Sequence, residues 1–167
     1  GGHLDIAARR HDTFGGNTIY TLRSDFQFVN NHQSGYLRIL RFFRMHATYG
    51  TGEPDRAGYL ACIAGRAGLA SLSAERVRME MLKLVVAEGA GDAVQAMADA
   101  GLLLAIFGGV TYTGTFAAMI AAERALALRP SAVRRLAALS VAVTEDAKRV
   151  AARLRLSNAE AKALEDA

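Results

Sequence analysis

Apolar residues recur with the period of an α-helix along most of this chain. At about 100° per residue, the segment 36–47 gathers its apolar side chains on one face: Tyr36, Ile39, Leu40, Phe43 and Ala47. Arg38, Arg41 and Arg44 share the adjacent arc. The pattern predicts a helix over 35–48 whose buried stripe is edged by three guanidinium groups. Such forks suit phosphate oxygens and base edges, although a surface helix with solvated arginines is the alternative.

Capping residues and glycines divide the rest of the chain into further predicted helices. They cover 55–69, 74–86, 92–100, 101–107, 115–128, 132–143, 144–155 and a last segment from 158. The predicted N-caps are Asp55, Ser73, Asp92, Ser131 and Thr144, and Ser157 with Glu160 forms a capping box. The pattern therefore predicts a mainly α fold, a multi-helical bundle or array.

Residues 1–33 follow a different pattern. Two short alternating pieces, 18–22 and 26–29, indicate weak strands joined by a turn at 23–25. We expect a small hairpin-like element that packs on the helices or on another chain, because an isolated hairpin is marginally stable. The predicted organisation is an N-terminal appendage over 1–33, then helical regions over 34–88 and 89–167.

Composition narrows the class of protein. The 167 residues suffice for one domain with an appendage, and the net charge of +4 is compatible with nucleic acid. The single cysteine, Cys62, lies in an apolar run, so we expect a small core residue and no disulfide within the chain. No apolar run reaches about 18 residues and no leader is visible, which indicates a cytoplasmic protein without a membrane segment.

The arginine helix also carries a family resemblance. The run Leu37-Arg-Ile-Leu-Arg-Phe-Phe-Arg44 resembles the LRxLRxxR segment of the bacterial tRNA nucleotidyltransferase/poly(A) polymerase family, of the class II CCA-adding type. In that family the segment lies in the neck, where an Asp and an Arg read the incoming CTP or ATP. The resemblance implies that Arg38 is the nucleotide-reading arginine. Its acidic partner is missing, because Ser34 and Gly35 occupy the acidic positions.

Later segments extend the resemblance over about 36–166. The run 73–84, SAERVRMEMLKL, is similar to the motif that joins neck to body, and 90–103, 133–139 and 145–164 resemble the body. Short pieces at 7–10 and 14–16 resemble the end of the catalytic head. The resemblance implies that 1–33 is a degenerate remnant of the head or a β appendage, that 34–88 are neck-like helices and that 89–167 are body-like helices. The resemblance implies that Arg41 and Arg76 also lie at the nucleotide site. The alternative is that Arg76 merely pairs with Glu80 at i+4.

A second group of cations is proposed to contact RNA. The C-terminal helices and the end of the arginine row offer a positive stripe for a tRNA backbone: Arg44, Arg134, Arg135, Lys148, Arg149 and Arg153. The alternative is a solvated helical surface, because Glu145, Asp146 and Glu160 are interleaved with these cations.

The carboxylates of nucleotidyl transfer are missing from the sequence. The family holds its metal ions with an Asp-x-Asp pair in the head, and this chain has no such pair. Asp5 and Asp12 are seven residues apart on no clear scaffold, and the histidines lack metal-ligand spacing. We expect His46 to be a half-buried packing residue. The chain should therefore bind no cofactor of its own, since Mg²⁺ and CTP or ATP act through the head.

These observations predict a tRNA-binding helical module that is not catalytic alone. Its expected partners are tRNA, a separate catalytic head or a second copy of the chain, and no membrane. Two alternatives stay open. One is a structural or oligomerisation module derived from the same family, and the other is a truncated gene product without independent activity. Salt-dependent tRNA binding separates the first prediction from both.

Overall fold

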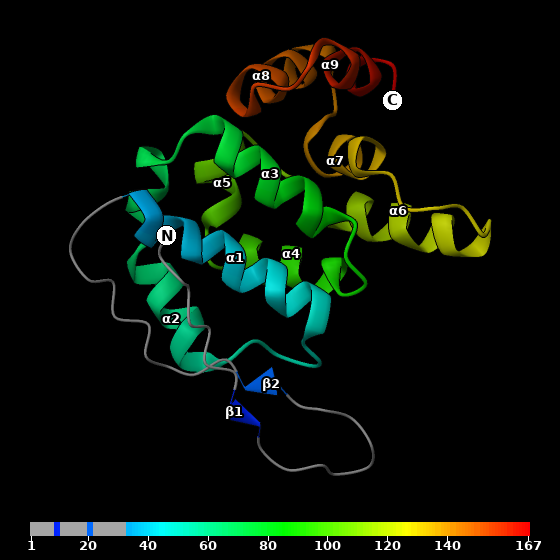
Figure 1. Ribbon diagram of the computed structural model, residues 1–167. Helices are drawn as coiled ribbons and strands as arrows, with labels where there is room; N and C mark the ends of the chain where they lie inside the picture. The colour runs from blue at the N-terminus through cyan, green and yellow to red at the C-terminus, as the bar shows by residue number, and fades with distance from the viewer. Residues whose placement is uncertain (1–8, 11–19, 22–32) are drawn as a thin grey trace, which may run out of the picture.

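The fold is a helical array, seen in a computed structural model that describes residues 9–10, 20–21 and 33–167 (Figure 1). The helices, in chain order, are α1 Gln33–Tyr49, α2 Arg56–Ala64, the 3₁₀ helix η1 Arg66–Ser71, α3 Ala74–Val85, α4 Ala90–Asp99, α5 Leu102–Phe107, α6 Thr113–Ala125, α7 Ala132–Ser140, α8 Thr144–Leu154 and α9 Asn158–Glu165. The mainly α prediction is confirmed.

The predicted hairpin falls almost wholly outside the described residues. The strands β1 Arg9–Arg10 and β2 Tyr20–Thr21 pair antiparallel, with Arg9 opposite Thr21. The predicted strand over 26–29 and the turn at 23–25 lie outside the described part of the chain. Within that part, no helix is both long and apolar enough to cross a bilayer.

One continuous hydrophobic core joins the helices. It is built around α1, whose Ile39, Leu40 and Phe43 are fully buried as the predicted stripe requires, and it extends to Leu164 on α9. Cys62 on α2 is fully buried, which confirms it as a small core residue. The core runs through both regions predicted as neck-like and body-like, so their division at 88 stays a prediction.

Helices α1 and α3 lie side by side and run in the same direction (Figure 1). At their N-terminal ends, η1 fits against α1 because Gly68 leaves room for the ring of Tyr36, which a Cβ would overlap. At their C-terminal ends, the Gly89 N–H donates to the Ala47 carbonyl at 2.8 Å. Polar side chains of the two helices can therefore meet along their shared edge.

Several predicted caps are confirmed and two are wrong. Asp55, Ser73, Ser131 and Ser157 each accept a hydrogen bond from the backbone of the helix they precede. Asp92 lies inside the first turn of α4, which begins at Ala90. Thr144 does not cap α8; instead Asp146 reaches back to the N–H groups of Ala142 and Val143.

Some predicted helices are too long. The segment predicted over 55–69 stops at Gly65 and continues as η1, where Gly68 approaches Tyr36 closely. The helix predicted to end at 128 ends at Ala125, because Ala127 takes a left-handed conformation with φ of 51°. The Leu128 N–H then bonds to the Glu123 carbonyl in a Schellman arrangement. Helix α7 ends at Ser140, not at 143, because Val141 is extended.

Candidate nucleic-acid interface

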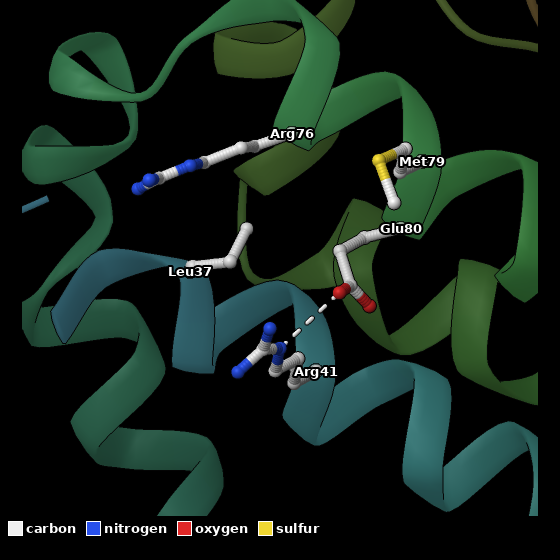
Figure 2. A pocket seen from close by; sticks show the side chains of 5 residues that line it. All are labelled: Leu37, Arg41, Arg76, Met79 and Glu80. Carbon is white, nitrogen blue, oxygen red and sulfur yellow. Dashed lines mark hydrogen bonds and ion pairs between the residues drawn. The ribbon is translucent and has the colours of Figure 1, made fainter. Parts of the chain in front are cut away.

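A shallow pocket opens along the edge that α1 and α3 share. Its volume is about 340 Å³, and it is lined by Leu37, Arg41, Arg76, Met79 and Glu80. Figure 2 shows Arg41 rising from α1 and Arg76 from α3 on opposite sides of Leu37. The structure thus brings together two of the three arginines predicted at the nucleotide site. An apolar floor with guanidinium groups at its rim suits a ligand that has both a flat apolar part and an anionic part.

The carboxylate of Glu80 organises two of the arginines of α1. Arg41 donates from Nε to Oε1 at 3.2 Å, and Arg44 donates from Nε to Oε2 at 2.6 Å. Glu80 is buried, with 7% of its surface exposed, whereas the side chains of Arg41 and Arg44 are 39% and 25% exposed. The carboxylate therefore binds both arginines from a buried position, and both guanidinium groups still reach the surface.

The side chains of three further cations of α1 and α3 have no partner among the described residues. Arg38, Arg76 and Lys83 are exposed, and none of these side chains makes a hydrogen bond or ion pair with a residue that the structure describes. The alternative pairing of Arg76 with Glu80 does not occur, because Arg41 and Arg44 take both oxygens of that carboxylate. Arg38 is exposed on α1 and is not among the residues that line the pocket.

We use the term α1/α3 face for Arg38, Arg41, Arg44, Arg76, Glu80 and Lys83. These five cations and one anion leave a surplus of four positive charges, which equals the net charge of the whole chain. The acidic and basic residues of the rest of the chain cancel. Helix α1 has no acidic residue. This face is therefore a positively charged part of the surface.

The two arginines of α7 pair with a buried carboxylate of α6; Arg135 is itself buried, whereas the side chain of Arg134 is 38% exposed. Glu123 of α6, with 2% of its surface exposed, receives Nε and Nη2 of Arg134 on Oε1 and Nε of Arg135 on Oε2 at 2.6 Å. Arg135 is itself buried, and its Nη1 donates to the carbonyl of Val85 at the end of α3. We call Glu123, Arg134 and Arg135 the Glu123 cluster. It ties α6 and α7 to α3.

The arginines of α8 stabilise the neighbouring helix α5. Arg153 donates to the carbonyls of Ala105 and Ile106 at 2.9 and 3.0 Å, which satisfies the C-terminal end of α5. Arg149 pairs with Asp146, and its guanidinium lies against Gly109, where a Cβ would collide with it. Of the predicted RNA contacts on the C-terminal helices, Lys148 alone is exposed and without a partner among the described residues.

Carboxylates of α3 and of the C-terminal helices are tuned by these contacts. Burial raises the pKa of Glu123, but hydrogen bonds from Arg135 and Arg134 outweigh it and hold the pKa below its ordinary value. Backbone N–H groups, aided by arginines, lower the pKa of Glu75, Asp146 and Glu160. The lowered pKa values favour the ionised form of all four; Glu75, Glu123 and Glu160 pair with arginines of other segments, whereas Asp146 acts within the start of α8.

Sequence reasoning missed the two carboxylates that decide which arginines are free. Glu80 and Glu123 lie on the buried sides of α3 and α6, positions at which an acidic residue needs a charged partner. That requirement was a usable signal, although the partner's identity was not, since Arg41 is 39 residues from Glu80. Lys83 and Met79 of the same surface were also overlooked as site residues.

One family model matches the chain. Residues 61–112 match the family described as "Probable RNA and SrmB- binding site of polymerase A". The match runs from within α2 to the start of α6 and covers about a third of the chain. It includes Arg76, Glu80 and Lys83 and so contributes one side of the α1/α3 face. A search of curated proteins finds no match.

The family match supports the broader part of the sequence prediction. It favours a poly(A) polymerase-like protein and an RNA-binding module, and it does not distinguish the CCA-adding branch. Within the described residues, no three His, Cys, Asp or Glu side chains gather in a way that could hold a metal ion. His46 is half-buried, as expected.

Proposed function

We propose that this chain is an RNA-binding helical module that grips the phosphate backbone of tRNA on the α1/α3 face. The observation that carries the proposal is that the α1/α3 face, with its four surplus positive charges, includes Arg76 and Lys83 of α3, which lie inside the segment that matches an RNA-binding family model; its other cations, on α1, precede that segment. Affinity for RNA comes largely from neutralising phosphates with arginine and lysine. Cations without internal partners are the ones available for that task.

The pocket on this face is the proposed nucleotide site. Arg41 and Arg76 line it with Leu37 and Met79, and Arg38 is exposed on α1 outside its lining. A base resting on the apolar floor would leave its phosphate within reach of the two guanidinium groups. Gly35 offers no carboxylate to accept from a cytosine or adenine amino group, so we expect weak and unselective nucleotide binding.

The module is proposed to have no nucleotidyl transfer activity alone. The sequence lacks an Asp-x-Asp pair, and the resemblance to the CCA-adding branch covers the neck and body. We therefore assign polymerisation to a catalytic head outside this set of residues. The cations of the Glu123 cluster, together with Arg149 and Arg153, support the fold. They are omitted from the proposed RNA surface because each donates from an Nη atom to another residue of the fold, whereas Arg41 and Arg44 donate to described residues from Nε alone.

The experiment is fluorescence anisotropy of the chain with labelled tRNA lacking its 3′ CCA, repeated over a salt series. We expect micromolar or tighter binding that weakens steeply with salt. No binding at low salt would overturn the proposal and direct attention to protein partners.

Two matched variants locate the surface. Arg76→Gln should weaken binding severalfold and reduce the salt slope by about 1, because one phosphate contact is lost. Arg129→Gln removes the same charge from an exposed position between α6 and α7 that is not among the candidate RNA contacts, and it should change little. Equal losses in both variants would mean that RNA responds to net charge and not to the α1/α3 face.

A further inference from the structure

We infer that Glu80 is the positioning residue of the α1/α3 face: it aims Arg41 and Arg44 at phosphate. This inference rests on the proposed function and goes beyond it, because it assigns a role in RNA binding to an acidic residue. Plain electrostatics would give a carboxylate under an RNA site the opposite role, since it would repel phosphate.

The hydrogen bonds place Glu80 behind the two guanidinium groups. Each arginine is held through Nε alone, one on each carboxylate oxygen, and no hydrogen bond from their Nη atoms to a described residue occurs. A guanidinium group is a rigid fork, so fixing Nε also fixes the plane and direction of the opposite edge. Both outer edges are thereby presented together, at the surface of α1.

Burial explains why the arrangement is fixed. The side chain of Glu80 is 9% exposed, and it stands on α3, whose Met81 and Leu84 are fully buried. Arg41 and Arg44 lie one turn apart on α1, which packs its own core face against α3. The carboxylate cannot swing out to water without leaving its two partners. The entropy of ordering the arginines is therefore spent on folding and not on binding.

The Glu123 cluster shows what a purely structural arginine pair looks like in the same chain. There, Arg135 is buried and donates from Nη1 as well as Nε, and Arg134 uses Nε and Nη2. On the α1/α3 face neither arginine donates from an Nη atom to a described residue. Exposure alone does not separate the two sites, because the side chain of Arg134 is 38% exposed and that of Arg41 is 39% exposed; the difference lies in which nitrogen atoms the fold already uses.

The test is the tRNA affinity of Glu80→Gln against that of Glu145→Gln, measured by anisotropy over the salt series. Both variants remove one negative charge, and Glu145 is exposed on α8. We expect Glu80→Gln to bind about threefold more weakly or worse and to lose about one unit of salt slope. Glu145→Gln should bind as the unmodified chain does, or slightly more tightly. Binding by Glu80→Gln as tight as by Glu145→Gln would overturn the inference.

Two further arms separate positioning from folding. Glu80→Asp keeps the charge but is shorter by one methylene, so it should also weaken binding, and it serves if Glu80→Gln does not fold. In an Arg41→Gln/Arg44→Gln background, Glu80→Gln should have no additional effect, since there is nothing left to aim. An undiminished effect in that background would show a merely structural role. Failure of the unmodified chain to bind tRNA would instead overturn the proposed function.

Discussion

The α1/α3 face and the Glu123 cluster contain the same kind of ion pairing, but the arginines have different roles in the two places. Each has a buried glutamate that binds two arginines. On the face, Glu80 leaves Arg41 and Arg44 partly exposed, and it also includes Arg38 and Arg76, whose side chains have no partner among the described residues. In the cluster, Glu123 holds Arg135 in the interior, where its charge serves packing. The number of arginines in a segment therefore says little about nucleic-acid binding until their partners are known.

The largest expected effect is the loss of stability when the carboxylate of the Glu123 cluster is removed. Glu123→Ala leaves the buried charge of Arg135 without a partner, so the free energy of unfolding should fall by about 3 kcal/mol or more. Urea denaturation measures it. Glu145→Ala, at an exposed position of α8, should change stability by less than about 0.5 kcal/mol. Similar small changes in both variants would show that the Glu123 cluster does not hold the fold together.

The next largest effect on stability is expected on acidification. Glu75, Glu123, Asp146 and Glu160 have lowered pKa values in the fold. Their contribution to stability is fully present above the unfolded-state pKa values, about 4.3 for Glu and about 3.9 for Asp, and is lost as pH falls through the folded values. Stability measured by urea denaturation should be flat with respect to these groups from pH 7 to 5 and should fall below about pH 4.5. A decline already complete at pH 5.5 would contradict this.

A smaller effect distinguishes surface arginines from structural ones. Arg38→Gln should weaken tRNA binding severalfold and leave stability within about 0.5 kcal/mol. Arg134→Gln should cost about 1 kcal/mol of stability, because it removes two hydrogen bonds to a buried carboxylate, and should leave tRNA affinity unchanged. The two readouts are thermal unfolding and anisotropy. If both variants lost affinity equally, the proposed division of the arginines would be wrong.

The reactivity of Cys62 serves as a local probe of the intact fold. Burial raises the pKa of this thiol to about 12, so it should react with a disulfide reagent at pH 8 at least about a hundredfold more slowly than in the unfolded chain. It is the single cysteine of the chain, so the rate reports on α2 beneath α1. In Glu123→Ala, a thiol that stays protected would show that loosening is confined to α6–α9.

Much of the fold followed from local rules. The buried stripe of α1 and the caps at Ser73, Ser131 and Ser157 depend on residues three or four positions apart, so periodicity detected them. The end of α6 was missed because Ala127, not a glycine, adopts the left-handed conformation there. The break after α2 was missed because it depends on the close approach of Gly68 to the ring of Tyr36, which lies 32 positions earlier in the chain.

For the candidate site, too, local features could be predicted and contacts between distant residues could not. The sequence by itself determined the helices, the net charge and the motifs that resemble a polymerase family, since these are properties of residue types and their spacing. Only the tertiary structure decided that Arg76 faces a pocket with Arg41, and that Arg135 is enclosed with Glu123. The physical reason is that a guanidinium group is neutralised by whichever carboxylate the fold brings within hydrogen-bond reach. Here those carboxylates are 36 to 39 residues away for α1 and 11 to 12 residues away for α7.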